Sequence, residues 1–389
     1  MKAMPTPIRL AAIGAGMRFS ILHDVLASLP QHFTLTVVAD SDPSLLAAAT
    51  ASSPHLQTFT DYTEAVTSPD VDAVLVLTPD WTHATIAMAA LGAGKHVFIE
   101  KPIATTVADA DRLITYASQC GRTLYVGHNM RFMPIVETIK TAIDDGLIGH
   151  PQAFMIRHFI GRGGDYFFKD WHCESSRTGG LLIHKASHDL DAMAYILGTT
   201  YTSVQAIGAN RVYQYGHLRQ PSASTPEVKN DIRNWPPHSQ TNLNPAMDVE
   251  DVSFINLVCA NGIIGSYSQC HFTPDYWRNY CIIGDEGRLE NFGDTSNGGS
   301  VRIWNKRRPG YDAQADIEIP IGMDHGTTSG HDGSDERILD DFYQTIHGGT
   351  PRTSSSDARQ VVAVGEAARL DILGNRNLSA LADRQTRMS

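Results

Sequence analysis

Short β-rich runs alternate with helical patterns between residue 8 and about residue 128, and this alternation constrains the fold more than any other feature. We expect strands in five places: Ile8–Ile13, Leu35–Ala39, Ala73–Leu77, His96–Ile99 and Leu124–Val126. We expect helices between them, at Ser20–Leu29, Pro43–Ala51, His83–Ala93 and Val107–Gln119. Such alternation is typical of a doubly wound parallel sheet with helices on both faces. The carboxyl ends of the strands then share one edge of the sheet, where ligands bind.

The pattern changes after a helix expected at Phe132–Asp145. Strand candidates then follow one another with few helices between them: Gln152–Phe159, Val204–Ala209, Asp251–Ala260, Ile263–His271, Tyr280–Ile283, Gly287–Asn291, Val301–Trp304 and Asp316–Ile319. The dipeptide Asn261-Gly262 is typical of a tight hairpin. We also expect helices at about Gly180–Leu197, at Asp335–His347 and at Asp357–Leu373. These elements predict an α+β domain with a large, mostly antiparallel open sheet.

A chain of 389 residues is too long for one ordinary core, so we expect two domains. The change of pattern places them at residues 1–128 and 129–375, followed by a polar tail at 376–389. Residues 211–248 stand apart because they are rich in Pro, Asn, Gln and Ser and have little periodicity. A stretch of this length is expected to be a functional loop or a disordered one.

Composition argues against several classes of partner. The net charge is −11, and the only basic cluster is the short Lys306-Arg307-Arg308, so we expect no nucleic-acid partner. Apolar stretches such as Ala73–Leu77 are far too short to cross a bilayer. Five cysteines form no CxxC pair, which is typical of reduced thiols in a reducing compartment. With no charged-then-apolar leader after Met1, we expect a cytoplasmic protein.

A glycine turn follows the first expected strand. Gly14 and Gly16 let the backbone approach a pyrophosphate, which would lie at the positive end of the next helix beside Met17 and Arg18. The third position of the dinucleotide-binding pattern departs from the rule, because Phe19 stands where Gly or Ala is expected. The turn therefore predicts a dinucleotide site with helix–strand packing that differs from the usual form.

Asp40 ends the second strand, 26 residues after Gly14. An acidic side chain there can accept hydrogen bonds from the adenosine ribose, and it would repel a 2′-phosphate. The next residue is Ser41, with no arginine following directly, so NAD is favoured over NADP. Asp40 could instead serve as the N-cap of the next helix.

Two further turns lie at the same expected edge. The first runs from Thr78-Pro79 to His83 and would pass over the nicotinamide half of the cofactor; the alternative for His83 is a first-turn helix residue without such a contact. The second is Glu100-Lys101-Pro102, which places a carboxylate and an ammonium at the ligand edge. A cis bond before Pro102 would aim Lys101 inward. The alternative for Lys101 is a surface salt bridge with Glu100.

A histidine pair marks the helix expected over Gly180–Leu197. His184, His188 and Asp191 have the spacing of one helix face, and Gly179-Gly180 before them permits close approach of a ligand to the backbone. The alternatives are buried structural histidines or a zinc site, in which Asp191, His172 or Cys173 would be the third ligand.

Together these residues resemble the Gfo/Idh/MocA oxidoreductases, the glucose–fructose oxidoreductase and inositol dehydrogenase group. The likeness runs nearly end to end and rests on the glycine turn, the Thr78-Pro79 to His83 turn, Glu100-Lys101-Pro102, Gly179 to Asp191, Val249-Glu250-Asp251, Gly284-Asp285-Glu286-Gly287 and Gly330 to Asp335. The resemblance implies a Rossmann domain joined to an open-sheet domain that binds substrate and builds homodimers or homotetramers. It also implies reversible oxidation of a secondary hydroxyl of a sugar, sugar derivative or cyclitol.

In that family a Lys, an Asp and a His meet at the substrate hydroxyl. Lys101 and His188 match the Lys and the His, whereas His184 stands at the Asp position. The loss of this carboxylate, with Lys101 nearby, is expected to lower the pKa of both histidines and of the lysine, so that either His188 or a neutral Lys101 can be the base. The segment containing Asn129 and Arg131 is expected to contact cofactor and substrate.

The aromatic and polar residues Tyr166, Trp171 and His172 are further candidates for the wall that faces the sugar, together with Arg131. The resulting hypothesis is an NAD(P)-dependent sugar or cyclitol dehydrogenase in which His184 orients the substrate oxygen and no metal takes part. Three alternatives stay open: an enzyme that cleaves glycosides through transient oxidation by NAD, a regulator that senses the nucleotide without chemistry, and a zinc enzyme.

Overall fold

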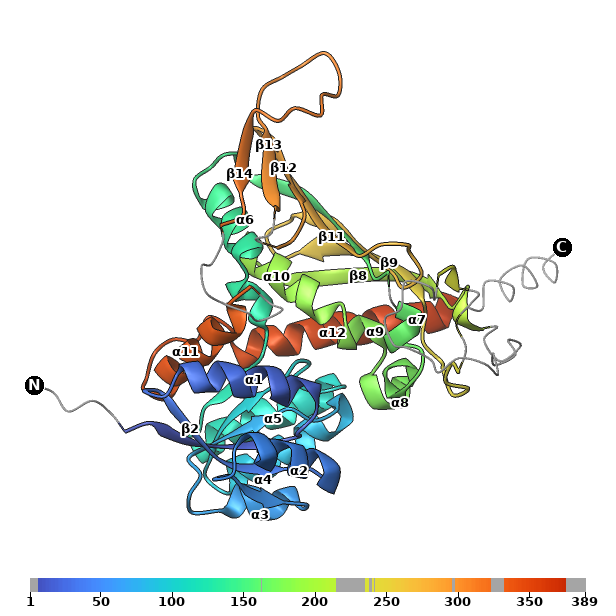
Figure 1. The fold of residues 1–389 in the computed structure, drawn as a ribbon. Helices are drawn as coiled ribbons and strands as arrows, with labels where there is room; N and C mark the ends of the chain where they lie inside the picture. The colour runs from blue at the N-terminus through green and yellow to red at the C-terminus, as the bar shows by residue number, and fades with distance from the viewer. Residues whose placement is uncertain are drawn as a thin grey trace, which may run out of the picture. The chain divides into compact units, whose positions relative to one another are not determined.

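The protein was analysed as a computed structural model that describes residues 6–161, 163–214, 235–237, 240, 242–295, 298–322 and 332–375. The chain forms two compact units (Figure 1). The first comprises Met1–Pro134 and Asp324–Val362, and the second Ile135–Met323 and Ala363–Ser389. In this division helix α11 (Ser334–Ile346) belongs to the first unit, and the domains expected at 1–128 and 129–375 stay a prediction.

The first unit contains a six-stranded parallel sheet in the order β3-β2-β1-β4-β5-β6. Its strands are β1 (Ile8–Ile13), β2 (Phe33–Ala39), β3 (Gln57–Phe59), β4 (Ala73–Val76), β5 (His96–Ile99) and β6 (Leu124–Val126). Its connecting helices are α1 (Met17–Ser28), α2 (Pro43–Ser52), α3 (Tyr62–Thr67), α4 (His83–Gly92) and α5 (Val107–Cys120). The predicted doubly wound sheet is confirmed. The strand order reverses at β1 and β4, where such folds bind ligands.

Local signals explain the ends of these helices. The Asp42 carboxylate accepts the Ser44 N–H at 2.8 Å and caps α2, whose first residue is Pro43. The N-cap of α2 is therefore Asp42, and the alternative that placed Asp40 there is wrong. Helix α5 begins after Thr106, which accepts the Asp109 N–H, and ends at Gly121 with a φ of 59°.

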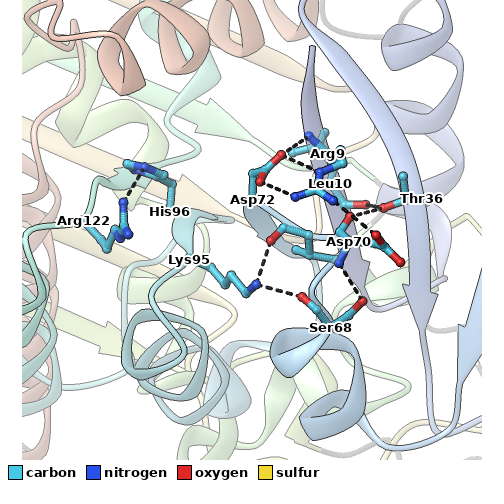
Figure 2. Close-up of polar contacts among 10 residues, drawn as sticks. Arg9, Leu10, Thr36, Ser68, Asp70, Asp72, Lys95, His96 and Arg122 are labelled. Atoms are coloured by element: carbon cyan, nitrogen blue, oxygen red, sulfur yellow. Dashed lines mark hydrogen bonds and ion pairs between the residues drawn. The ribbon is translucent and has the colours of Figure 1, made fainter. Parts of the chain in front are cut away.

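Charged side chains tie the amino-terminal ends of the strands together (Figure 2). Arg9 on β1 binds Asp72, just before β4, through three hydrogen bonds, and it also reaches Asp70 at 3.2 Å. Lys95, just before β5, donates to the carbonyls of Ser68 and Val71 at 2.8 and 2.7 Å. These contacts lie at the edge opposite the ligand edge and fix the starts of three strands.

The second unit contains an eight-stranded sheet in the order β14-β13-β12-β11-β7-β10-β9-β8. Its strands are β7 (Pro151–Phe159), β8 (Tyr201–Ala209), β9 (Val252–Cys259), β10 (Ile264–Cys270), β11 (Trp277–Gly284), β12 (Arg288–Phe292), β13 (Ser300–Trp304) and β14 (Ile317–Pro320). Only β7 and β10 pair in parallel; all the other neighbours are antiparallel. The predicted mostly antiparallel open sheet is confirmed.

One face of this sheet packs against helices. Tyr201 on β8 donates to the Leu190 carbonyl of α10 (Ser187–Leu197) at 2.7 Å. Asp371 of α12 (Ser355–Asn375) accepts the Ala206 N–H of β8 at 3.1 Å, and α12 runs beside the sheet (Figure 1). The other face exposes large apolar side chains: Met155, Ile207, Phe254, Val258, Ile264 and Ile283.

The remaining helices are α6 (Pro134–Asp144), α7 (Gly163–Tyr166), α8 (Ser175–Thr178), α9 (Leu181–His184) and α11 (Ser334–Ile346), with 3₁₀ turns η1 (Asp80–Thr82), η2 (Asn129–Phe132) and η3 (Trp171–Cys173). In the predicted 211–248 segment the structure describes residues 211–214, 235–237, 240 and 242–248. The rest of that segment and the predicted tail at 376–389 lie outside the described residues. None of the helices described is long and apolar enough to cross a membrane.

The continuous helix predicted over Gly180–Leu197 is wrong. The structure has two helices, α9 and α10, which are separated at Lys185 and Ala186. The N–H groups of Lys185 and Ala186 share the Leu181 carbonyl, at 2.8 and 3.2 Å, so the regular hydrogen-bond pattern is interrupted there. His184 therefore ends one helix and His188 lies in the first turn of the next, so they do not share one face of a regular helix.

Candidate active site

The glycine turn at the ligand edge has the shape that a dinucleotide needs. Gly14 has a φ of 98°, and a Cβ there would lie 2.9 Å from the Leu77 backbone, so only glycine fits. A Cβ at Gly16 would meet nothing within 4 Å, which leaves open space directly before the first N–H groups of α1. The first turn of α1 has no acidic residue, so its positive end is available to a pyrophosphate.

Asp40 supports this turn from the end of β2. Its Oδ2 accepts the Ala15 N–H at 2.7 Å and its Oδ1 accepts the Asp42 N–H at 2.9 Å. One carboxylate thus binds the backbone of the glycine turn between Gly14 and Gly16. The ribose contact predicted for Asp40, and the neighbouring exposed Ser41, stay predictions.

Arg18 joins three segments of the first unit that are far apart in the sequence. Its Nε lies 2.5 Å from Glu100 Oε1, and its terminal nitrogens bind both oxygens of Asp335 at 3.0 and 2.8 Å. Asn129 donates to the same Asp335 at 3.0 Å. Burial alone would lower the pKa of Arg18, but Glu100 and Asp335 raise it above its ordinary value. Arg18, Glu100 and Asn129 were predicted to touch the cofactor; here Arg18 binds both Glu100 and Asp335, and Asn129 binds Asp335.

Asp335 was not among the predicted site residues. It is fully buried at the start of α11 and carries the charge that Arg18 needs. In the sequence, Asp335 stood out only as the last residue of a segment, Gly330 to Asp335, that resembles a segment of the family. A pairing across 317 positions leaves no local pattern that could have identified it.

Lys101 lies directly after β5, at the carboxyl edge of the sheet. Its N–H donates to Glu100 Oε2 at 3.2 Å, and the Lys101–Pro102 bond is cis. Thr78 and Pro79 form the neighbouring turn after β4, where the Thr82 hydroxyl binds the Thr78 hydroxyl at 2.7 Å. The first unit therefore places Gly14, Asp40, Thr78 and Lys101 at the carboxyl ends of four strands of one sheet.

Two predicted site residues of the first unit lie in its interior. His83 is buried, and its ring contacts the carbonyls of Thr78 and Pro102. Arg131 is also buried; its Nη1 lies 2.5 Å from the Arg352 carbonyl and 3.2 Å from Asp357 Oδ2. Met17 lies on the surface, with two thirds of its area exposed.

In the second unit four of the predicted substrate residues lie together. The ring of His172 stacks on Trp171 with 3.9 Å between centroids and lies 4.6 Å from Tyr166 and 5.0 Å from His184. Phe167 packs edge-on against His184 at 5.9 Å. The segment between β7 and α10, which includes Gly179-Gly180, thus builds a cluster of aromatic and imidazole rings. His188, in the first turn of α10, is half-buried.

A buried charged network holds the start of α10 against the sheet. Asp189, next to His188, accepts from His158 Nδ1 at 2.9 Å and from the Tyr280 hydroxyl at 2.8 Å, and Arg278 Nε lies 2.8 Å away. Burial lowers the pKa of His158 to about 4, so this ring is neutral near pH 7. Burial raises the pKa of Asp189, but Arg278 and His158 lower it below its ordinary value. None of these residues was predicted, because their pairing depends on the register of β7 and β11.

The part of the chain that the structure describes contains no group of three His, Cys, Asp or Glu side chains placed to hold a metal ion, as the zinc alternative would need. His172 contacts Asp170 through Nδ1, and the Cys173 thiol donates to the Asp170 carbonyl at 3.1 Å.

Comparison with known proteins agrees with this fold. Residues 8–128 match the profile described as oxidoreductase family, NAD-binding Rossmann fold, and residues 136–290 match the GFO/IDH/MocA C-terminal domain. The chain is 32% identical over 53% of its length to the uncharacterized oxidoreductase YrbE of Bacillus subtilis, of which it covers 58%. It is 29% identical over 52% of its length to the myo-inositol 2-dehydrogenase of Thermotoga maritima, of which it also covers 58%.

The chain therefore spans less than two thirds of the length of these curated relatives. Among solved structures, levoglucosan dehydrogenase in complex with NADH and levoglucosan has a similar fold, with a TM-score of 0.76 at 22% identity, covering 95% of this chain and 98% of that one. The glycine turn, its open space and the free positive end of α1 fit a dinucleotide. The first unit is an NAD-binding Rossmann domain, as predicted. With the two family profiles matching more than half of its length, this chain belongs to the GFO/IDH/MocA oxidoreductase family.

Proposed function

We propose that this protein is an NAD-dependent dehydrogenase that oxidises a secondary hydroxyl of a sugar, sugar derivative or cyclitol. One observation carries the proposal: Arg18, in the first turn of the helix that receives the pyrophosphate, binds Glu100, the residue directly before Lys101, at 2.5 Å. This contact joins the cofactor helix to the lysine turn. An ammonium is thereby held at the ligand edge of an NAD-binding sheet, where a hydroxyl proton has to be accepted.

Each protein group would have a separate task. NAD, when bound, supplies the redox chemistry by accepting the hydride from the carbinol carbon. Lys101 or His188 accepts the hydroxyl proton as the general base and afterwards releases it to water. His184 orients the hydroxyl oxygen through a ring nitrogen. Asp40 keeps the glycine turn in shape and disfavours a 2′-phosphate, so NAD is preferred to NADP.

The substrate class is supported by the cluster in the second unit. Aromatic rings such as Trp171 and Tyr166 can stack on the apolar faces of a pyranose or cyclitol ring, while His172 and His184 offer groups that bind hydroxyls. The myo-inositol and levoglucosan dehydrogenases among the similar proteins act on polyols of this kind by name. We therefore propose an uncharged polyhydroxylated ring as the substrate.

The direct test follows NADH absorbance with purified protein, NAD or NADP, and a panel of cyclitols, aldoses, anhydrosugars and glycosides. We expect reduction of NAD with one polyol class and much slower reduction of NADP. Lys101→Met should slow this reduction by about 10²- to 10⁴-fold while NAD binding, measured by calorimetry, persists. If NAD binds and no member of the panel is oxidised, the dehydrogenase proposal is wrong.

We also propose a homodimer or homotetramer formed through the open sheet. The support is the apolar face described above, on which Ile207, Phe254 and Ile264 are each more than half exposed. Neighbouring strands pair Ile207 with Phe254 and Val258 with Ile264, so these apolar side chains lie on one face of three adjacent strands. Light scattering should give a mass that is a multiple of 42.5 kDa, and Phe254→Glu should reduce it to that of one chain. A wild-type mass of 42.5 kDa would contradict the assembly.

We propose the cytoplasm as its compartment. The support is that all five cysteines are unpaired, as reducing conditions require.

A further inference from the structure

His83 occupies an unusual position for a residue expected to touch the cofactor. It is the first residue of α4 and only 1% of its surface is exposed. Its Nε2 lies 2.8 Å from the Thr78 carbonyl oxygen, and its Nδ1 lies 2.7 Å from the Pro102 carbonyl oxygen. One imidazole ring thus spans two turns that leave neighbouring strands, β4 and β5, at the ligand edge.

Other contacts also hold each turn. In the turn after β4, the Thr82 hydroxyl lies 2.7 Å from the Thr78 hydroxyl and 2.7 Å from the Pro79 carbonyl. In the turn after β5, Glu100 accepts the Lys101 N–H at 3.2 Å. The Lys101 backbone therefore lies between Glu100 on its amide side and the carbonyl of Pro102, bound by His83, on the other.

The chemistry of imidazole suits this bridge. A protonated ring donates from both nitrogens to the two carbonyls, and a neutral ring donates to one of them. The two nitrogens lie on different sides of a rigid ring, whereas the donors of a glutamine amide belong to a single atom. Glutamine can therefore replace one of the two contacts, and leucine can replace neither.

We propose that His83 is a positioning residue that locks the turn of Thr78 to the turn of Lys101, and so fixes the Lys101 ammonium relative to the cofactor loop. This inference rests on the proposed dehydrogenase function and deepens it. His83 does not touch the reacting atoms; it acts through the backbone on either side of Lys101. A displacement of about 1 Å in such a site can lower turnover by about 10²-fold.

The first experiment compares His83→Leu and His83→Gln with a matched control, His96→Gln. His96 lies at the other end of β5, where its Nδ1 accepts the Thr123 N–H at 3.2 Å. We expect kcat to fall about 10²-fold in His83→Leu and less in His83→Gln, with KM for the polyol and the Kd for NAD changed only a few-fold. The control should keep its kcat. Folded His83→Leu with wild-type kcat would overturn the inference.

A second readout does not depend on activity. Hydrogen–deuterium exchange of the protein without cofactor should show faster exchange in both turns, residues 78–83 and 100–104, in His83→Leu. Residues 95–97, at the opposite end of β5, should keep their protection. Faster exchange in one turn only, or equally across the whole unit, would contradict the bridge. If His83→Leu does not fold, the same comparison is made with His83→Gln.

Chemical rescue sharpens the test. In His83→Gly, added imidazole should restore part of the lost turnover in a saturable way, because it can enter the space left by the ring. 1-Methylimidazole should restore less, because one of its nitrogens cannot donate. Equal rescue by both compounds, or none by either, would overturn the two-carbonyl role. Failure of the proposed function would look different, because the wild-type protein itself would then oxidise no polyol.

Discussion

The two edges of the parallel sheet both carry arginine–carboxylate clusters, yet they differ in burial. At the amino-terminal edge, the side chains of Arg9 and Asp72 are each about two-fifths exposed, and Asp70 is 70% exposed (Figure 2). At the carboxyl edge, Arg18 is 18% exposed and Asp335 is completely buried. The arginine–carboxylate pairs are thus exposed to water at one edge and surrounded by protein at the other.

This difference assigns separate tasks to similar residues. Exposed pairs contribute little, because water screens them and long side chains lose entropy on pairing. A buried pair cannot lose one partner without leaving an uncompensated charge in the interior. We therefore expect the amino-terminal edge to tolerate substitution, and the carboxyl edge to require its charges for both folding and cofactor binding.

The two lysines that flank β5 give the strongest test of this contrast. Lys101→Met should lower kcat by about 10²- to 10⁴-fold, the usual contribution of a general acid or base, while NAD still binds. Lys95→Met should leave kcat unchanged and cost about 1 kcal/mol of unfolding free energy, because two hydrogen bonds to carbonyls are lost. Steady-state kinetics measures kcat, and urea unfolding measures the free energy of unfolding, in each of the two variants. Equal losses of kcat in the two variants would remove the distinction between the edges.

The two arginines compare the clusters themselves. Arg18→Met should destabilise the protein by about 3–5 kcal/mol, because Glu100 and Asp335 lose their shared cation inside the protein. Arg9→Met should cost about 1 kcal/mol or less. Urea unfolding measures the free energy of unfolding of each variant. If Arg18→Met does not fold, Arg18→Lys takes its place. Because Arg18→Lys keeps the charge, its loss of stability should lie between those expected for Arg9→Met and Arg18→Met. A loss below about 1 kcal/mol for Arg18→Met would contradict the buried-pair argument.

Asp40 tests whether a carboxylate at the ligand edge serves the cofactor. Asp40→Ala leaves the Ala15 N–H without its acceptor, so the glycine turn should loosen and NAD affinity should fall by about tenfold, as for a hydrogen bond to a charged group. Asp70→Ala, at the other edge, should bind NAD as the wild type does. Calorimetric titration with NAD distinguishes them, and an unchanged Kd for Asp40→Ala would show that the turn holds its shape unaided.

The smallest expected effect concerns Asp72 and pH. The Arg9 guanidinium, through its hydrogen bond, lowers the pKa of Asp72 below its usual range. A depressed pKa in the folded state stabilises the protein above the unfolded value of about 3.9, and this stabilisation is lost as the pH falls through the folded pKa. Asp72→Asn should therefore cost about 0.2–1 kcal/mol at pH 7, and this cost should shrink as the pH falls through the folded pKa. A difference that grows on acidification would have the wrong sign.

Much of the fold could be predicted because its signals are local. The alternation of apolar runs and helical patterns identified five of the six parallel strands, and every strand of the open sheet was expected within a few residues of its position. Strand β3 and helix α3 were missed because three and six residues are too few to show a period. The break between α9 and α10 was missed because it depends on which carbonyl the Ala186 N–H binds.

The candidate site was predicted less completely, for a related reason. Motifs identified the residues that follow each strand, such as Gly14, Thr78 and Lys101, since those positions are set by the local chain. They did not reveal that Arg18 binds Asp335 or that His83 spans two turns. Those contacts depend on side chains from distant segments, and whether Lys101 and His188 act on one substrate stays a prediction.

The first unit is discontinuous along the chain, and this has a consequence during synthesis. Ile338, Leu339 and Phe342 of α11 are fully buried in the same core as Leu10, on β1. A ribosome that has finished the six parallel strands must still add some two hundred residues before these side chains emerge. During that interval the nascent sheet lacks part of its apolar cover, and such surfaces attract chaperones or aggregate. The parallel strands of the nucleotide-binding unit thus precede the open-sheet unit in synthesis, but their core is completed only after the strands of that unit have been made.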